Sequence, residues 1–152
     1  MTNEKKQEKV KRFFEIVKKM QNSERMAIGL LILKKNDDMT NIVDNVIKKQ
    51  SIKLIEVNKE EDSQKIINEM TSAFEKGQGM ALRLSNTLDA MIYNQLDIIS
   101  QAGHMEYPTK DERKFVYPTK GSYLVLISTD QELESMNYTN IFNLVTLTER
   151  LP

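Results

Sequence analysis

The residues between an apolar run and an amphipathic run near position 34 have the setting of an anion-binding loop. Gly29 to Lys49 is typical of a buried strand, a polar loop and a helix. A phosphate-binding loop in that setting needs glycines, whose backbone N–H groups converge on the anion, and a lysine followed by Ser or Thr. The loop contains neither feature, so we expect the frame without the phosphate chemistry. Its candidate residues are Lys34, Lys35, Asn36, Asp37, Asp38, Thr40 and Asn41.

A second candidate site mixes aromatic and basic residues on a hairpin that is predicted around the polar turn 109–112. Such a surface can stack nucleic-acid bases and contact phosphates. It can equally contact a protein, or its rings can pack across the two strands beside a solvated turn. The sequence leaves these three roles open. The candidate contact residues are Tyr107, Lys110, Arg113, Lys114, Phe115 and Tyr117.

Metal and hydrolytic chemistry have little support. In a strand, the single histidine, His104, and Glu106 would face the same side and could be two metal ligands. A metal site usually needs three or four ligands, so we expect a structural or exposed histidine and no metal. Asp37 and Asp38 could hold a cation, but acidic residues near a helix start are the simpler interpretation. We expect no cofactor.

The elements that would position these residues follow from apolar periodicity. Helical stripes alternate with short apolar runs, which is typical of an α/β fold with helices on both faces of a mainly parallel sheet. We therefore predict a three-layer sandwich, with an N-terminal amphipathic helix (1–25) before an α/β domain (26–152). Thr40 is expected to cap the second helix. The predicted helices are 4–21, the segment after Thr40, 63–74, 88–100 and 133–138, and the predicted strands are 27–33, 52–57, 80–84, 123–128 and 142–147.

Composition narrows the classes of protein. The chain has 152 residues, zero formal net charge and no cysteine. Residues 1–20 are mostly basic among their charges, whereas acidic residues prevail from Gly77 onward, so the N-terminal helix could meet an anionic partner. No apolar run approaches the roughly 18 residues that span a bilayer, and no secretory signal begins the chain. We expect a cytoplasmic protein without membrane contact.

The order and spacing of elements from Met26 to Pro152 resemble an AAA+ ATPase core, of the MoxR-like and MCM-type branch with a hairpin before the fourth strand. In that resemblance GLLIL leads into Walker A, KGQGMALRLSN is the Walker B strand, and HMEYPTKDERKFVYP is the pre-sensor hairpin. GSYLVLISTDQ is the sensor-1 strand, and NYTNIFNLVTL is the segment that usually carries an arginine finger. The resemblance implies a P-loop NTPase fold, here without the family's helical lid, because the sequence stops at Pro152.

The family's catalytic residues do not carry over to this sequence. The Walker A lysine and hydroxyl positions fall near Thr40 and Asn41, and sensor 1 falls near Thr129 or Asp130. The Walker B acidic pair falls near Ser85 and Asn86, and the arginine finger near Ile141. Phosphoryl transfer depends on these groups for positioning and charge stabilisation. The resemblance therefore implies a catalytically inactive scaffold or binding domain, not an enzyme, that acts through a protein partner or self-association, with nucleic acid as a further candidate partner.

Two alternatives remain. One is a DNA- or RNA-binding regulator that uses the N-terminal helix and the hairpin. The other is a receiver-like signalling domain of the flavodoxin type, although Leu84 and Ser85 stand where a phosphoacceptor aspartate is expected. Strand order separates the folds, because the AAA+ arrangement inserts the fourth strand between the first and the third. The flavodoxin-like order instead places the first strand beside the third.

Overall fold

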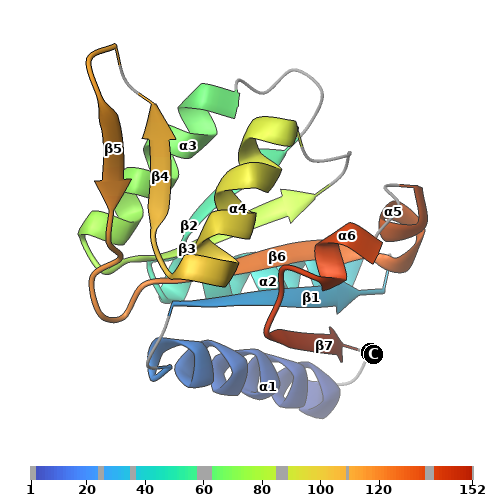
Figure 1. The fold of residues 1–152 in the computed structure, drawn as a ribbon. Helices are drawn as coiled ribbons and strands as arrows, with labels where there is room; N and C mark the ends of the chain where they lie inside the picture. The colour runs from blue at the N-terminus through green and yellow to red at the C-terminus, as the bar shows by residue number, and fades with distance from the viewer. Residues whose placement is uncertain are drawn as a thin grey trace.

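The computed structural model describes residues 3–23, 26–34, 37–57, 63–84, 89–108, 110–135 and 139–151. Helices and strands alternate along the chain, with a hairpin before the sixth strand (Figure 1). The elements are α1 (Asn3–Gln21), β1 (Ala27–Leu33), α2 (Asp37–Lys49), β2 (Lys53–Val57), α3 (Ser63–Glu75), β3 (Gly79–Leu84), α4 (Ala90–Ala102), β4 (Met105–Pro108), β5 (Arg113–Val116), β6 (Tyr123–Thr129), α5 (Asp130–Ser135), α6 (Thr139–Phe142) and β7 (Leu147–Leu151).

Five parallel strands form the main sheet in the order β2-β3-β6-β1-β7, and β4 and β5 form a separate antiparallel pair. The strand β6 lies between β1 and β3, pairing Tyr123 with Ala27 on one side and with Gly79 on the other. The AAA+ arrangement requires this placement of the fourth strand of the parallel sheet. The flavodoxin-like order is wrong for this chain, because β1 and β3 are not neighbours.

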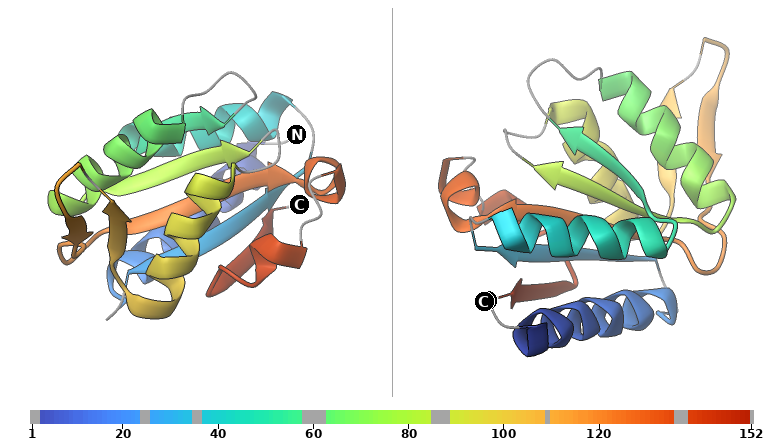
Figure 2. Two further views of the ribbon diagram at one scale, coloured as in Figure 1. Left: turned by 45° about the horizontal axis from the view of Figure 1, so that its top comes forward. Right: turned by 180° about the vertical axis from the view of Figure 1, so that it is seen from behind.

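Helices cover both faces of the sheet, as predicted. Strand side chains alternate between faces, so Leu30 and Leu126 join one buried cluster while Leu31 and Val125 join the other. α1 and α2 pack on the second of these faces, and α3, α4 and the hairpin pack on the first. α4 lies in front of the sheet in Figure 1, whereas α2 lies in front of it in the reverse view of Figure 2.

The direction of the chain explains this division of the helices. From β1 the chain crosses the sheet to the far edge at β2, and it then returns through β3 to β6. Right-handed crossovers that run in opposite directions place their helices on opposite faces. The outward crossover therefore puts α2 on one face, and the returning crossovers put α3 and α4 on the other.

The N-terminal helix α1 packs on one face of the sheet, in the buried cluster that it shares with α2. Phe13, Val17 and Met20 are buried and share a cluster with strand residues of β1 and β6. A Cβ atom at Gly29 would lie 2.8 Å from the Met20 sulfur, so glycine lets α1 approach β1 closely. The apolar stripe that the sequence predicted for this helix is thus the surface that covers the sheet.

The sequence placed the start of the second helix too late. α2 begins at Asp37, so the loop predicted over 34–41 is wrong for residues 37–41. Thr40 lies inside the helix and does not cap it. Acidic residues are favoured in the first turn of a helix, where they complement the partial positive charge of its N-terminus. Asp37 and Asp38 therefore extend the helix toward β1.

The C-terminal region also differs from prediction. Residues 142–147 were expected to form a strand, but α6 covers Thr139–Phe142 and β7 begins only at Leu147. Ile141 and Leu144 are both buried, and their spacing of three residues suits a helical turn better than a strand. The short helix predicted at 133–138 begins earlier, at Asp130.

Candidate functional site

The carboxyl ends of the parallel strands are the first place to seek a ligand site, because open α/β sheets bind ligands there. At the end of β1, Lys34 is exposed, and only residues 34–36 connect the strand to α2. That connection is shorter than a glycine-rich phosphate loop. The positions of Lys35 and Asn36, and the side chains of residues 37–42, lie outside the described residues. Of the three connecting residues, the structure therefore describes Lys34 alone.

Thr129 at the end of β6, which the resemblance matches with sensor 1, caps a helix. The Glu132 backbone N–H donates to Thr129 Oγ1 (3.2 Å), and the Thr129 backbone N–H donates to Glu132 Oε1 (3.2 Å). The Thr129 hydroxyl also donates to that carboxylate oxygen (2.9 Å). These reciprocal bonds form a capping box at the start of α5. The sequence pattern Thr-x-x-Glu signals such a cap, but the sequence reasoning missed it.

Two further polar pairs stabilise this edge. The Ser128 hydroxyl, which is buried, donates to the Leu84 carbonyl oxygen (3.0 Å) and so ties β6 to the end of β3. Arg150 of β7 forms an ion pair with Asp130, the first residue of α5. Both partners in this ion pair are largely exposed. Ser128, Asp130 and Arg150 therefore each have a polar partner within the fold.

An arginine on β3 extends the same pattern to α2 and β2. Arg83 Nη2 lies 2.5 Å from Asp44 Oδ1 of α2, and Arg83 Nη1 lies 3.4 Å from Glu56 Oε1 of β2. None of these three residues was predicted from the sequence to belong to a site. Ser85 and Asn86, the positions expected for the acidic pair, lie outside the described residues. Ile141, at the arginine-finger position, is a buried core residue of α6.

The second candidate site is the hairpin, and one side of it is docked firmly on the domain. Met105 and Val116 lie opposite each other in the hairpin, and both are buried in the core cluster that includes α3 and α4. The Gln95 side chain of α4 donates to the Glu106 carbonyl oxygen (2.8 Å) and accepts from the Glu106 N–H (3.3 Å). Backbone position is thus fixed by both core packing and hydrogen bonds.

The other side of the hairpin presents aromatic rings to solvent. Phe115 is 49% exposed and Tyr117 is 70% exposed, which places them among the few large apolar side chains at the described surface. The ring of His104 is close to both, with centroid separations of 5.7 Å to Phe115 and 5.1 Å to Tyr117. These three residues are called the aromatic face below. His104 therefore packs against two aromatic rings.

Charges around the aromatic face are largely neutralised. Arg113 Nη1 lies 2.5 Å from Glu106 Oε1, and the other carboxylate oxygen lies 3.7 Å from His104 Nε2. Lys114 alternates to the opposite side of β5, the side of Val116. Lys110 is exposed at the turn. Of the predicted contact residues, the structure brings together Arg113, Phe115 and Tyr117.

The Tyr107 side chain lies outside the described residues. Within the described ranges, no three His, Asp or Glu side chains are grouped closely enough to form a metal site.

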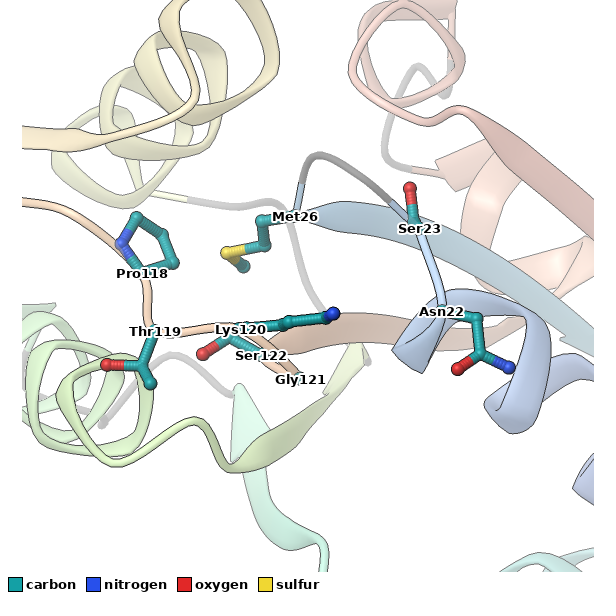
Figure 3. Close-up of a pocket in the computed structure, with 8 residues that line it drawn as sticks. All are labelled: Asn22, Ser23, Met26, Pro118, Thr119, Lys120, Gly121 and Ser122. Atoms are coloured by element: carbon teal, nitrogen blue, oxygen red, sulfur yellow. The ribbon is translucent and has the colours of Figure 1, made fainter.

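A cavity of about 420 Å³ lies at the opposite, amino ends of β1 and β6 (Figure 3). Lys120 extends across it, and Asn22, Ser23 and Met26 form its far wall. Its hydroxyl groups serve the fold, since Thr119 Oγ1 donates to the Glu75 carbonyl oxygen (2.8 Å) and Ser122 Oγ donates to the Phe74 carbonyl oxygen (3.2 Å). These bonds tie the loop before β6 to the end of α3.

No helix in the described part of the chain has the length and apolar character needed to cross a bilayer. A comparison with protein-family models gave no match, and no curated protein matched the sequence.

Proposed function

We propose that this chain is an AAA+-like domain that does not hydrolyse nucleotide and acts in the cytoplasm as a protein-binding or scaffold module. The strand order supports the AAA+-like assignment, since β6 lies between β1 and β3. The short connection from β1 to α2 supports the lack of hydrolysis. So do the sequence positions of Ser85 and Asn86, which carry no carboxylate for a magnesium ion.

The observation that carries the binding role is the aromatic face on a docked hairpin. Phe115 and Tyr117 are exposed, while Met105, Val116 and Gln95 hold the backbone beneath them. Aromatic side chains are enriched at protein interfaces, where a rigid ring buries much surface with little loss of conformational entropy. A partner that covers these rings would meet a surface that needs little reorganisation.

A protein fits this surface better than a nucleic acid does. The charges of the hairpin offset one another, since Arg113 forms an ion pair with Glu106, and the acidic residues Asp111 and Glu112 stand between Lys110 and Lys114 in the sequence. Nucleic-acid binding draws most of its affinity from unpaired cations that neutralise phosphates. The partner is a second protein or another copy of this chain.

The double variant Phe115→Ser/Tyr117→Ser tests the proposal, with Lys110→Ser/Asp111→Ser at the adjacent turn as the matched control. Sedimentation velocity over a wide concentration range measures self-association. A photoreactive amino acid at position 115 reports a second protein by cross-linking in the native host. We expect self-association that the control retains and that the aromatic double variant loses. For a second protein, we expect a cross-link from position 115 that the control retains. Because the photoreactive residue itself replaces Phe115, loss of that cross-link is tested with Tyr117→Ser.

Three results would contradict the proposal. One is magnesium-dependent phosphate release from ATP that Thr40→Ala or Asp38→Ala abolishes. Another is salt-sensitive binding of a single-stranded oligonucleotide that Arg113→Ala/Lys114→Ala weakens, which would favour the nucleic-acid role. The third is a chain that stays monomeric and gives no specific cross-link at position 115.

A further inference from the structure

A second surface lies on the other face of the sheet, where α1 and α2 meet. An open hollow of about 450 Å³ is lined by Gln7, Val10, Lys11, Phe14 and Lys49, and it is called the α1–α2 hollow here. The two helices that flank it are seen together in the reverse view of Figure 2. It is separated from the hairpin by the sheet, so it is independent of the function proposed above.

The floor of the α1–α2 hollow is apolar. Val10 and Phe14 are half-buried, and they pack against the core cluster that α1 and α2 share with the sheet. They are therefore anchored from below and leave part of their surface open to a partner. An apolar side chain placed on them would lose contact with water, which is the main favourable term in association.

The rim of the α1–α2 hollow is basic. Lys11 and Lys49 are exposed on its two sides, and Lys18 is exposed on the same stripe of α1 as Lys11, one heptad along. Among the described residues, none of these three lysines has an ion-pair partner. The two lysines that line the hollow, Lys11 and Lys49, complement a ligand that carries carboxylates on either side of an apolar group.

One basic residue on the other flank of α1, Arg12, already has ion-pair partners. Arg12 Nη2 lies 2.8 Å from Glu149 Oε1 of β7, and this hydrogen bond raises the pKa of Arg12 above its ordinary value. Glu15 lies 3.7 Å from the same guanidinium. Among the described residues, Lys11 at the hollow therefore has no ion-pair partner, whereas its neighbour Arg12 has two.

We propose that the α1–α2 hollow binds an acidic segment of a partner protein, which inserts one large apolar side chain between Lys11 and Lys49. Glu8 and Glu15 are exposed on α1 outside the lining of the hollow and would repel the phosphates of a nucleic acid or an anionic membrane. Most of the apolar stripe of α1 is buried against the sheet, so among its described residues Val10 and Phe14 alone are left to contact a bilayer. A peptide can reach the hollow while keeping its carboxylates away from those glutamates.

Synthetic peptides of twelve residues, with Asp and Glu on both sides of one central Leu, Ile, Phe or Trp, are the probes. Amide chemical shifts of the labelled protein locate binding even when it is weak. We expect shifts at residues 7–18 and 48–50, and none for peptides in which the central residue is Ser. Peptides in which Asn and Gln replace the acids should bind about tenfold more weakly, since each exposed charge pair contributes modestly.

Charge reversal separates this proposal from a general effect of charge or a loss of fold. Lys11→Glu/Lys49→Glu should lose the acidic peptide and gain a peptide with Lys in place of its acids. Lys19→Glu/Lys76→Glu, with the same change in net charge on residues outside the hollow, should bind as the parent chain does.

Several outcomes would overturn the proposal. They are the absence of shifts near the hollow with all four peptides, equal loss of binding in both double variants, and a failure of charge-swapped rescue. If phosphatidylserine vesicles or a twelve-nucleotide oligomer bound the same surface more tightly than the acidic peptides do, the surface would be assigned to a membrane or a nucleic acid instead.

Discussion

Gln95 bonds both backbone polar groups of Glu106, donating to its carbonyl oxygen and accepting from its N–H. One side chain on α4 therefore does for β4 what a neighbouring strand does for a strand inside a sheet. The Gln95 side chain is also buried, so water cannot readily replace it. The exposed aromatic face depends on this internal contact for its position.

Replacing Gln95 by Leu should loosen the hairpin. Glu106 would lose the hydrogen-bond partner of two backbone groups, and we expect the free energy of unfolding to fall by about 1–3 kcal/mol. Amide hydrogen exchange at residues 105–116 should be faster in the variant than in the parent chain, with a smaller change at other residues. Gln101→Leu is the control, because Gln101 is exposed on the same helix and its side chain donates to Asp97 of that helix (2.9 Å) and not to the described part of the hairpin. Unchanged exchange in the hairpin of Gln95→Leu would show that core packing alone holds it.

Gly79→Ala should be strongly destabilising because of Tyr123, which is its partner in the neighbouring strand. A Cβ atom at Gly79 would lie 2.1 Å from Tyr123 Cζ. Overpacking of this kind lowers the free energy of unfolding by about 1–3 kcal/mol or more. Tyr123→Leu removes the atoms that collide, so the added loss from Gly79→Ala should be smaller in that background. Urea denaturation of the four proteins in this cycle measures the coupling, and simple additivity would contradict a direct clash.

Alkaline pH should destabilise the fold through Tyr123. Burial of the phenol raises the pKa of Tyr123 to about 12 from its ordinary value of 10.0. A raised pKa means that the folded chain holds this proton more tightly than the unfolded chain does. The stabilising contribution is therefore complete below pH 10 and is lost between about pH 10 and 12, by at most about 1–3 kcal/mol.

The measurement is the free energy of unfolding of the parent chain and of Tyr123→Phe across that range. The decline should be shallower in Tyr123→Phe, which has no phenol to titrate. Equal slopes for the two proteins would mean that Tyr123 ionises as easily in the folded chain as in the unfolded one.

Thr129→Ala should weaken the start of α5. The variant loses the hydroxyl that accepts from the Glu132 N–H, and caps of this kind contribute about 0.5–2 kcal/mol. Glu132→Gln should lose less, because an amide can still complete a capping box. Thermal denaturation ranks the two variants. A larger effect for Glu132→Gln would mean that the carboxylate charge, and not the cap, stabilises this region.

The two central strands β1 and β6 were predicted closely from the sequence, unlike the last strand, β7. β1 and β6 are apolar runs with polar or charged residues beside them, and strands buried on both faces need that composition. The order of the strands is a long-range property that apolar periodicity does not contain. It was expected only through the resemblance to AAA+ cores, and residues such as Tyr123 and Gly79 meet because of it.

The contacts of the candidate sites were harder to foresee. The sequence grouped Lys114 with Arg113, but alternation along β5 places them on opposite sides. Arg150 and Asp130 lie far apart in sequence and form an ion pair, and nothing local signals it. The capping box of Thr129 and Glu132 was the exception, since its spacing is readable in the sequence.

The strand order also sets when this domain can fold during its synthesis. β1 is synthesised before the other strands of the sheet, yet both of its neighbours, β6 and β7, are synthesised after β2 and β3. Until then, α1 and α2 are the elements that share a core cluster with its apolar residues. The close approach of Met20 of α1 to Gly29 gives an early contact that protects the nascent strand from aggregation until β6 and β7 have been made.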